Sequence, residues 1–579
     1  MAARLLAELH GITKRFRGAS EPALMDVTAR VLAGQVTGLV GPDGAGKTTL
    51  LRIMAGLLVP DQGELSVCGC NPVSEANVIH SQIGYMPQRF GLYEDLSVIE
   101  NLCLHADLRG VVGEERQRIF ERLLAFTDLA RFQSRLAGRL SGGMKQKLGL
   151  ACTLLAKPRL LLLDEPGVGV DPISRRELWR MVHELVNENM GVVWSTAYLD
   201  EAERCDDVLL VNSGKLLYAG TPRGLTDRVR GRTFQIQHIS HRLRQVLSHM
   251  LCQDGVLDGV IQGRNIRLTL RNEARIPNRD ELQAGTNATA VPVEPRFEDA
   301  FVDILGGAPG GDSTLAKEMS VIPDDGAATV EADHLTRRFG DFTAAQDITF
   351  SIGRGRIFGL LGPNGAGKST TFKMLCGLLK PTSGSARVAG LDLQHSPSKA
   401  RARIGYMAQK FSLYGALSVH QNLEFFSGVY GLRGRQQRDS LERMINTFGL
   451  RSHVNATTEG IPLGFKQRLA LACAVMHSPA VLFLDEPTSG VDPITRREFW
   501  THINGMVEKG VTIVVTTHFM DEAEYCDEIG LVYRGRMIAS GAPDDLKTSV
   551  QSETLPDPTL EDAFIALIER FDAEGTNAP

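Results

Sequence analysis

Two segments of the chain carry residue types that bind phosphate groups. Residues 41–48 have the sequence Gly-Pro-Asp-Gly-Ala-Gly-Lys-Thr, and residues 362–369 have the sequence Gly-Pro-Asn-Gly-Ala-Gly-Lys-Ser. Both match the P-loop pattern, in which glycines let backbone N–H groups surround a phosphate and a lysine adds positive charge. The final hydroxyl, of Thr48 or Ser369, is the ligand that Mg²⁺ needs. The predicted nucleotide-binding residues are Gly41, Gly44, Gly46, Lys47, Thr48, Thr49, Gly362, Gly365, Gly367, Lys368, Ser369 and Thr370.

An acidic pair follows each P-loop at the same interval. Asp164-Glu165 and Asp485-Glu486 each end an apolar run, 117 residues after the P-loop lysine (164 − 47 and 485 − 368). We expect the two aspartates to hold Mg²⁺ through water and the two glutamates to polarise the attacking water. An isolated Asp-Glu pair is usually an exposed strand end, but the fixed position behind a P-loop favours catalysis. The expected cofactors are therefore ATP and Mg²⁺, and the expected reaction is hydrolysis of ATP.

The elements that must position these residues occur twice. The two P-loop lysines are 321 residues apart (368 − 47), and residues 83–102 recur in similar form as residues 404–423. Within each half, short apolar runs alternate with helical patterns, which is typical of an α/β domain with a mainly parallel sheet. Internal repetition of this kind predicts two homologous domains.

The repeat also gives the expected boundaries. Residues 1–229 form the first domain, and residues 330–579 form the second. Residues 230–305 are predicted to be a small α+β appendix and C-terminal extension of the first domain, to which the sequence assigns no chemistry. Residues 306–329, rich in Gly, Pro, Ser and Asp, are predicted to be a flexible linker.

Composition limits the class of protein. Apolar residues make up 43% and charged residues 23% of the chain, as in ordinary globular proteins. No run of 18 apolar residues occurs, so no segment is expected to span a bilayer as a helix, and the first residues do not resemble a secretion signal. The net charge of −5 gives no general attraction to nucleic acid, which is not an expected partner. We expect the chain in the cytosol.

Further motifs identify the superfamily. Residues 141–146, Ser-Gly-Gly-Met-Lys-Gln, resemble the signature motif of ABC-type ATPases, and the resemblance covers nearly the whole chain. It implies two P-loop ATPase domains in tandem, each with a helical subdomain, that pair head to tail. The roles it implies are signature contacts to the nucleotide for Ser141, Gly142 and Gly143, Q-loop ligands of Mg²⁺ for Gln88 and Gln409, D-loop aspartates for Asp171 and Asp492, a γ-phosphate contact for His518, and adenine stacking for Phe16 and Phe339. For the two phenylalanines, packing in the core is the alternative.

Two positions depart from the family pattern. In the second half, Pro462 and Leu463 replace the serine and first glycine of the signature. Proline has neither the hydroxyl nor a backbone N–H, and leucine blocks close approach to a phosphate. In the first half, Ala197 stands where the histidine belongs, and the D-loop is unusual at Gly167 and Val168.

Head-to-tail pairing would place these defects in one site. The first P-loop would face Pro462 and Leu463 in the half that lacks the histidine, whereas the second P-loop, with Glu486 and His518, would face the intact signature. We therefore expect one hydrolytic site and one site that mainly binds ATP. Because Glu165 is present, slow turnover at the weaker site stays open.

The sequence is similar to the tandem ATPases of multidrug-type exporters, which work with separate ABC-2-type permease chains. The motifs that carry this similarity are LSGGMKQKLGLACTL, DEPGVGVDP, PLGFKQRLALA and FMDEAEYCD. The similarity implies two integral-membrane permease subunits, peripheral attachment at the cytoplasmic face of the inner membrane, and drug-like or other small compounds as cargo. The simplest expected stoichiometry is one copy of the chain per transporter, since each chain holds two ATPase domains.

An apolar and aromatic cluster follows each Q-loop glutamine and is interpreted as a socket for a permease helix, with simple packing as the alternative. The cluster residues are Phe90, Leu92, Tyr93, Phe411, Leu413 and Tyr414. Other functions remain open at this point. A sugar-type importer ATPase is the nearest one, although its second P-loop often lacks the lysine that Lys368 supplies here. A soluble ribosome-acting ABC protein should have two intact signatures, and a DNA-repair ABC ATPase should have zinc-type cysteine clusters.

Overall fold

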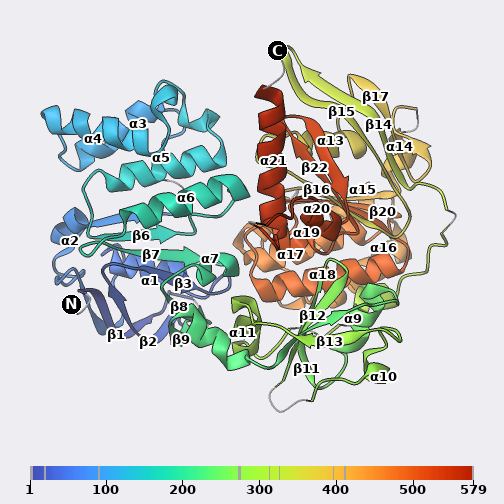
Figure 1. Cartoon of the computed structure of the whole chain (residues 1–579), viewed down its shortest axis with the longest axis horizontal. Coiled ribbons are helices and arrows are strands. Elements are labelled where there is room, and N and C mark those ends of the chain that lie inside the picture. Colours follow the sequence, from blue (N-terminus) through green and yellow to red (C-terminus); the bar gives the residue numbers. More distant parts are fainter. Residues whose placement is uncertain are drawn as a thin grey trace. The chain divides into compact units, whose positions relative to one another are not determined.

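The structure is a computed structural model that describes residues 4–18, 21–88, 91–271, 275–308, 310–311, 313–324, 326–395, 397–409, 413–553 and 555–576. The chain divides into two compact units (Figure 1). The first unit contains residues 1–230, 294–305 and 490–493, and the second contains residues 231–293, 306–489 and 494–579. Among the described residues, no helix combines the length and apolar character needed to cross a membrane.

A six-stranded sheet forms the centre of the first unit. Its order is β5-β6-β7-β3-β8-β9, and all neighbours are parallel except β8 and β9. Strand β3 is buried along its whole length, as expected for a parallel strand covered on both faces. A second, antiparallel sheet has the order β2-β1-β4. The strands are β1 (Leu5–Lys14), β2 (Leu24–Leu32), β3 (Val36–Val40), β4 (Gln62–Val67), β5 (Ile83–Met86), β6 (Leu160–Asp164), β7 (Gly191–Thr196), β8 (Asp207–Asn212) and β9 (Lys215–Gly220).

The helices of the first unit include the three that form its helical subdomain, α3, α4 and α5. Helix α11, which lies about 70 residues beyond α8 in the sequence, packs against α7 and α8 and so belongs to this unit. The helices are α1 (Lys47–Met54), α2 (Ala76–Gln82), α3 (Val98–Leu108), α4 (Gly113–Phe126), α5 (Gly142–Leu154), α6 (Pro172–Leu185), α7 (Leu199–Glu203), α8 (Pro222–Thr226) and α11 (Phe297–Ile304).

The second unit repeats this plan. A six-stranded sheet has the order β19-β20-β21-β16-β22-β23, and a four-stranded antiparallel sheet has the order β15-β14-β17-β18. The strands are β14 (Val330–Phe339), β15 (Phe342–Ile352), β16 (Ile357–Leu361), β17 (Ser383–Val388), β18 (Leu391–Asp392), β19 (Ile404–Met407), β20 (Val481–Asp485), β21 (Thr512–Thr517), β22 (Glu528–Tyr533) and β23 (Arg536–Gly541). The helices are α13 (Lys368–Leu375), α14 (Pro397–Arg401), α15 (Val419–Val429), α16 (Gly434–Thr447), α17 (Leu463–Val475), α18 (Pro493–Glu508), α19 (Met520–Ala523), α20 (Pro543–Ser549) and α21 (Leu560–Thr576).

The stretch that the sequence assigns to an extension of the first domain is divided between the two units. Residues 231–293, called the appendix below, belong to the second unit, whereas residues 294–305, which include α11, belong to the first. The appendix is an antiparallel sheet of order β11-β12-β10-β13 with two helices. Its elements are β10 (Thr233–Gln237), α9 (Leu243–Leu251), β11 (Val256–Gln262), β12 (Asn265–Leu270), α10 (Arg279–Leu282) and β13 (Thr289–Pro292).

The predicted linker also has structure in part. Helix α12 (Thr314–Lys317) lies within it, and Leu315 and Ala316 are buried. The hydroxyl of Ser313 lies 3.0 Å from Nδ1 of His502 on α18. Burial of these apolar side chains and the contact between Ser313 and His502 hold this part of the linker on the second domain.

Candidate functional site

The first P-loop connects β3 to α1 and depends on glycine at its end. Gly46 caps α1 with a φ of 106°, a backbone conformation that glycine adopts without strain. A Cβ atom added there would lie 2.4 Å from the carbonyl oxygen of Ala23. At Gly44, by contrast, φ is 77° and no atom lies within 4 Å of an added Cβ. The loop is thus packed on one side and open at its turn.

Lys47 is buried beneath this loop. Its Nζ donates hydrogen bonds to the carbonyl oxygens of Gly41 at 2.7 Å and Pro42 at 3.2 Å. The same Nζ lies 3.2 Å from Oε1 of Glu165, with both side chains at most 7% exposed. The lysine charge is therefore fixed between the loop and the predicted catalytic acid.

The acidic pair of the first domain meets the P-loop and the Q-loop. Asp164 ends β6 and accepts a hydrogen bond of 3.1 Å from Oγ1 of Thr48. Burial raises the pKa of Asp164, and the hydrogen bond from Thr48 lowers it in part. Glu165 has a φ of 51° and accepts a bond of 2.5 Å from Nε2 of Gln88. The structure thus brings together the residues that the sequence assigns to Mg²⁺ and water.

The second P-loop repeats this geometry. Gly367 caps α13 with a φ of 104°, and an added Cβ would lie 2.2 Å from the carbonyl oxygen of Ala344. Nζ of Lys368 donates to the carbonyl oxygens of Gly362 at 2.6 Å and Pro363 at 3.0 Å. The side chains of Thr49, Ser369 and Thr370, in the first turns of α1 and α13, are partly buried.

The acidic pair of the second domain has an additional partner. Glu486 accepts a hydrogen bond of 2.7 Å from Nε2 of Gln409, and its Oε2 lies 3.4 Å from Nδ1 of His518. Burial acts to raise the pKa of Glu486, but the interactions with His518, Lys368 and Gln409 together lower it. Asp485 accepts a bond of 2.5 Å from Oγ1 of Thr516, and burial raises its pKa. At the position of His518, the first domain has the buried Ala197.

Both sites fit a nucleotide with its magnesium ion. Thr48 and Asp164 in the first site, and Ser369 and Asp485 at the equivalent positions of the second, supply a hydroxyl and a carboxylate. Gln88 and Gln409 add an amide oxygen, and such oxygen ligands suit Mg²⁺. The P-loop presents its backbone N–H groups at a helix N-terminus, where an anion is favoured. Gly365, like Gly44, has positive φ and open space around an added Cβ, so the loop can accept a phosphate closely.

The two signature helices begin differently. Ser141 caps α5, and its hydroxyl accepts a hydrogen bond of 3.3 Å from the backbone N–H of Met144. An added Cβ at Gly143 would lie 2.6 Å from the side chain of Ser174, so the helix is close to α6 there. Helix α17 begins after Pro462, which has the same extended conformation but provides no side-chain cap. The helix therefore forms without a serine at the position that the sequence assigns to a nucleotide contact.

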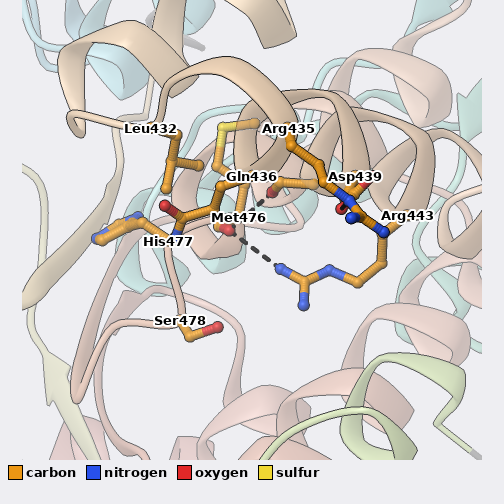
Figure 2. A pocket seen from close by; sticks show the side chains of 9 residues that line it. Leu432, Arg435, Gln436, Asp439, Arg443, Met476, His477 and Ser478 are labelled. Atoms are coloured by element: carbon orange, nitrogen blue, oxygen red, sulfur yellow. Dashed lines mark hydrogen bonds and ion pairs between the residues drawn. The ribbon is translucent and has the colours of Figure 1, made fainter.

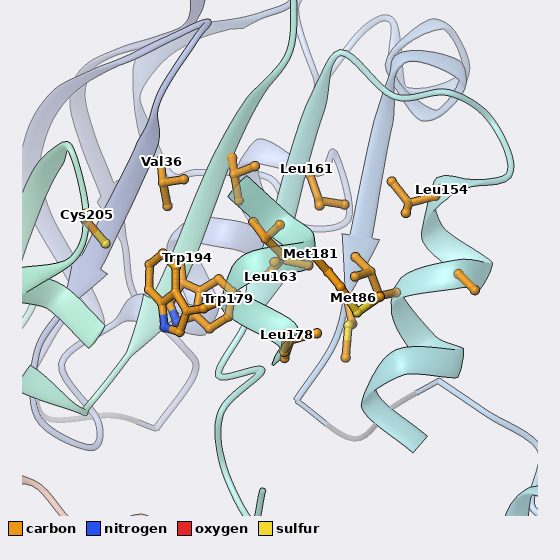
Figure 3. Close-up of a cluster of buried hydrophobic side chains, with 14 of the residues drawn as sticks. Val36, Met86, Leu154, Leu161, Leu163, Leu178, Trp179, Met181, Trp194 and Cys205 are labelled. Carbon is orange, nitrogen blue, oxygen red and sulfur yellow. The ribbon is translucent and has the colours of Figure 1, made fainter. Parts of the chain in front are cut away.

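The unusual D-loop glycine makes room for a buried acid that the sequence did not point to. A Cβ at Gly167 would lie 2.1 Å from Oε1 of Glu201. Glu201 accepts hydrogen bonds from Nε1 of Trp194 at 2.8 Å and Oγ1 of Thr196 at 2.6 Å, and burial raises its pKa to about 7. Trp194 stacks on Trp179 at 4.3 Å between ring centroids (Figure 3).

The D-loop aspartate of the first domain is a helix cap. Asp171 precedes α6 and accepts hydrogen bonds from the backbone N–H of Ser174 at 3.1 Å and from its hydroxyl at 3.0 Å. Its counterpart, Asp492, directly precedes α18. The first D-loop is therefore fixed to the helix that follows it in the chain.

The predicted adenine-stacking residues are accessible. Phe16 follows β1 and is 46% exposed, and Phe339 ends β14 and is 48% exposed. Neither ring is packed in the core, which was the alternative. The guanidinium of Arg337 lies over the Phe339 ring at 4.6 Å.

Each unit has a groove beside its helical subdomain. In the first unit a groove of about 650 Å³ is lined by Leu57, Leu108, Glu115 and Lys157, among others. In the second unit a groove of about 500 Å³ occupies the corresponding place (Figure 2). Its lining residues are Leu432, Arg435, Gln436, Asp439, Ser440, Arg443, Met476, His477 and Ser478.

The socket residues predicted after the Q-loops are only partly within the described chain. Tyr93 and Tyr414 are both exposed, and Leu92 packs against the core of the first unit. Phe90 and Phe411 lie outside the described residues.

Comparison with known proteins gives a consistent result. The family model described as ABC transporter matches residues 24–168 and 345–489. The probable multidrug ABC transporter ATP-binding protein YbhF of Escherichia coli K12 is 59% identical over 573 residues, which cover 98% of this chain and 99% of YbhF. The linearmycin resistance ATP-binding protein LnrL of Bacillus subtilis 168 is 35% identical over 41% of this chain and 78% of LnrL. A solved ATP-binding subunit of an ABC transporter is 28% identical, with a TM-score of 0.39, and covers 42% of this chain and 99% of that one.

Proposed function

Because the chain belongs to the ABC transporter family, as an ATPase with two ATP-binding domains, we propose that it is the motor subunit of an exporter for drug-like or other small compounds. The names of YbhF and LnrL, which refer to multidrug transport and linearmycin resistance, support export of such compounds. The two P-loops and their acidic pairs supply the chemistry for the motor.

The chain's own residues divide the work of hydrolysis. The bound ATP and Mg²⁺ supply the transferable phosphoryl group and the cation that neutralises its charge. Lys368 adds a fixed positive charge next to the loop, where charge develops on the phosphate. Glu486, held by Gln409 and His518, orients the attacking water and accepts its proton. With its pKa lowered, Glu486 is ionised at neutral pH, which is the form that can accept a proton.

The single observation that carries the proposed hydrolytic role of the second domain is the contact between His518 and Glu486 at 3.4 Å. The first domain has Ala197 at the position of His518. We propose that the second P-loop pairs with the signature at Ser141, as the family pattern implies. This site then has both the histidine and the signature. The other site combines Ala197 with Pro462 and lacks two groups that stabilise charge on the γ-phosphate.

The weaker site is proposed to bind and hold ATP. Its P-loop is complete, and Lys47 is fixed at 3.2 Å from Glu165. Binding needs the loop, whereas fast hydrolysis also needs charge stabilisation in the transition state. Turnover at this site is therefore slow, with Glu165 as its remaining acid.

We further propose that two ABC-2-type permease subunits dock on the two grooves and hold the chain at the cytoplasmic face of the inner membrane. Apolar exposure recurs at equivalent positions, with Leu108 74% exposed in the first unit and Val429 62% exposed in the second. Leu108 lines the first groove, and Val429 lies three residues before Leu432, which lines the second. Exposed apolar groups at such positions suit an amphipathic helix. The first groove contains the ion pair of Lys157 with Glu115 at 2.9 Å, whereas Arg443 in the second donates to the carbonyl of Met476. This difference supports docking segments of different sequence.

The experiment that tests the proposed function is purification of the tagged chain from membranes in mild detergent. The expected result is MgATP hydrolysis together with two hydrophobic proteins in near-equal amounts. The variant carrying Leu108→Ser and Val429→Ser should lose both proteins but keep its ATP binding, because these side chains are exposed. Val321→Ser, an exposed apolar residue away from the grooves, is the matched control. Recovery of ribosomes, or of no membrane protein, would contradict the transporter assignment.

A further inference from the structure

The appendix is attached to the second domain by an arginine with four hydrogen bonds. Arg244 of α9 donates to both carboxylate oxygens of Asp527, at 2.9 and 3.0 Å, to the carbonyl oxygen of Tyr525 at 3.0 Å and to Oδ1 of Asn504 at 3.1 Å. A bidentate pair of this kind is among the strongest protein hydrogen-bonding arrangements. In Figure 1 the green α9 and the orange α18, which contains Asn504, lie next to each other.

Asp527 also belongs to the framework of the P-loop. Its Oδ2 accepts a hydrogen bond of 2.8 Å from the backbone N–H of Ile357, the first residue of β16. Strand β16 leads directly into the second P-loop. The first domain has the same framework contact, from Val36 to Asp206 at 2.8 Å. The appendix therefore binds a carboxylate that both domains use to fix the P-loop strand.

A second contact is a buried ion pair. Nε and Nη2 of Arg497 on α18 lie 3.3 and 3.2 Å from Oδ2 of Asp258 on β11. The two side chains are only 10% and 4% exposed. Nη1 of Arg497 donates to the hydroxyl of Tyr525 at 3.0 Å. Removing one partner of a buried pair leaves a charge without compensation, so these groups hold the appendix and α18 together firmly.

Helix α18 connects this ion pair to the residues around the γ-phosphate. It begins directly after the D-loop residue Asp492. Arg496, the neighbour of Arg497, lies 3.7 Å from Glu522, with both side chains buried. Glu522 accepts a hydrogen bond of 2.7 Å from the hydroxyl of Thr517, which precedes His518. One turn of α18 thus contacts the appendix on one side and supports the histidine segment on the other.

We propose that the appendix is a positioning element for ATP hydrolysis in the second domain, and that Asp258 and Arg244 are its positioning residues. Asp258 holds the first turns of α18 through Arg497, which fixes the D-loop and the segment of His518. Arg244 holds the turn at Asp527, which fixes β16 and the P-loop. This inference rests on the proposed function, in which the second domain provides the hydrolytic site.

The test is Asp258→Asn in the purified transporter, combined with Glu165→Gln so that hydrolysis depends on the second site. We expect kcat to fall about tenfold or more, because small displacements of catalytic groups have effects of this size. KM for MgATP should stay within about twofold, since the P-loop contacts are intact. An unchanged kcat would overturn the inference. If Glu165→Gln alone abolishes hydrolysis, the proposed function fails instead, so the two failures are distinguishable.

A double variant separates positioning from simple stabilisation. Asp258→Asn with Arg497→Met removes both charges, which restores much of the stability that a single change loses. If the pair positions α18, thermal unfolding recovers but kcat stays low. If the pair only stabilises the fold, kcat recovers with stability, and the inference is wrong.

Milder and control variants complete the design. Tyr525→Phe removes only the hydroxyl that Arg497 contacts, and it should also lower kcat without changing KM. This variant replaces Asp258→Asn as the test if Asp258→Asn does not fold. The control is Arg264→Ala, which breaks an exposed ion pair with Asp545 at 2.8 Å between the same two parts of the chain. Exposed pairs contribute little, so this variant should keep its kcat. A loss equal to that of Asp258→Asn would argue against a specific path through α18.

Discussion

His518 and Ala197 occupy the same position of the repeat (518 − 197 = 321), so this side chain differs between the two domains next to their predicted catalytic acids. In the proposed mechanism His518 donates to the γ-phosphate while it contacts Glu486, and the methyl side chain of Ala197 has no group that could do so. The proposed difference between the two sites therefore depends on a small number of polar groups. The other difference is at the signatures, where Ser141 precedes α5 and Pro462 precedes α17.

We predict that His518→Ala lowers kcat for ATP hydrolysis about a hundredfold, because it removes a group that stabilises charge in the transition state. Nucleotide affinity should change little, since Lys368 and the loop remain. The reverse change, Ala197→His, should leave kcat within twofold, because the partner signature of that site still has Pro462. Steady-state ATPase measurements on the purified transporter compare the two variants. A large gain with Ala197→His would contradict the role given to Pro462.

A second prediction concerns Ser141, which both caps α5 and serves the proposed intact site. Ser141→Ala should lower the free energy of unfolding by about 1 kcal/mol, because the bond to the N–H of Met144 is lost. It should also reduce hydrolysis strongly. Pro462→Ala, at the equivalent position, removes no side-chain cap and should leave hydrolysis unchanged. Chemical denaturation and ATPase assays check both effects, and equal losses of activity would be inconsistent with the asymmetry.

The residues of the two sites could be predicted from the sequence because their motifs are local. The P-loop pattern specifies glycines at positive φ, and the acidic pair follows an apolar strand. Trp194 and Glu201 were missed, since no motif predicts a buried hydrogen bond between them. The only signal in the sequence was Gly167, an unusual residue for the D-loop. The structure explains this glycine, because a Cβ atom there would collide with Glu201.

Among the helices, α18 has a buried histidine that its counterpart α6 lacks. His502 lies 3.0 Å from the Ser313 hydroxyl, and its ring is 5.2 Å from that of Phe448. Burial, together with the charge of the nearby Arg468, lowers the pKa of His502 to about 4. The equivalent residue of the first domain (502 − 321 = 181) is Met181. The histidine is therefore neutral in the folded second domain.

This histidine predicts acid sensitivity of the second domain. The unfolded chain protonates His502 below its ordinary pKa of about 6.5, whereas the folded chain does so only near 4. Stability is therefore complete above about pH 6.5 and falls as the pH drops toward 4, by roughly 3 kcal/mol. His502→Met should reduce this slope. Thermal unfolding between pH 7 and pH 4 measures it, and an identical slope in the variant would contradict the assignment.

The elements inside each domain followed from the sequence, but the attachment of the appendix did not. Apolar runs such as residues 160–164 predict buried strands directly. The contacts of Arg244 with Asp527 and of Asp258 with Arg497 join residues that are 283 and 239 positions apart. No local pattern indicates which charged residue will find a partner at such a separation. The packing of part of the linker could not be predicted for the same reason, since Ser313 contacts His502, which lies 189 positions further along the chain.

The whole chain combines two ATP-binding domains with an appendix. The repeat provides two nucleotide sites that differ in a few polar groups, and the appendix joins the second domain although it lies between the two domains in sequence. In the proposed transporter, ATP binding at both sites and hydrolysis mainly at one would move the docked permeases. This transporter therefore depends on a difference between the two proposed catalytic acids, Glu486 and Glu165.

The most direct test compares Glu486→Gln with Glu165→Gln in the purified transporter. Both variants keep the shape of the side chain and remove its charge, and both glutamates accept a hydrogen bond from a Q-loop glutamine. The account predicts that Glu486→Gln lowers the ATPase rate about a hundredfold or more, whereas Glu165→Gln keeps at least about half of it. Equal losses in the two variants would contradict the account.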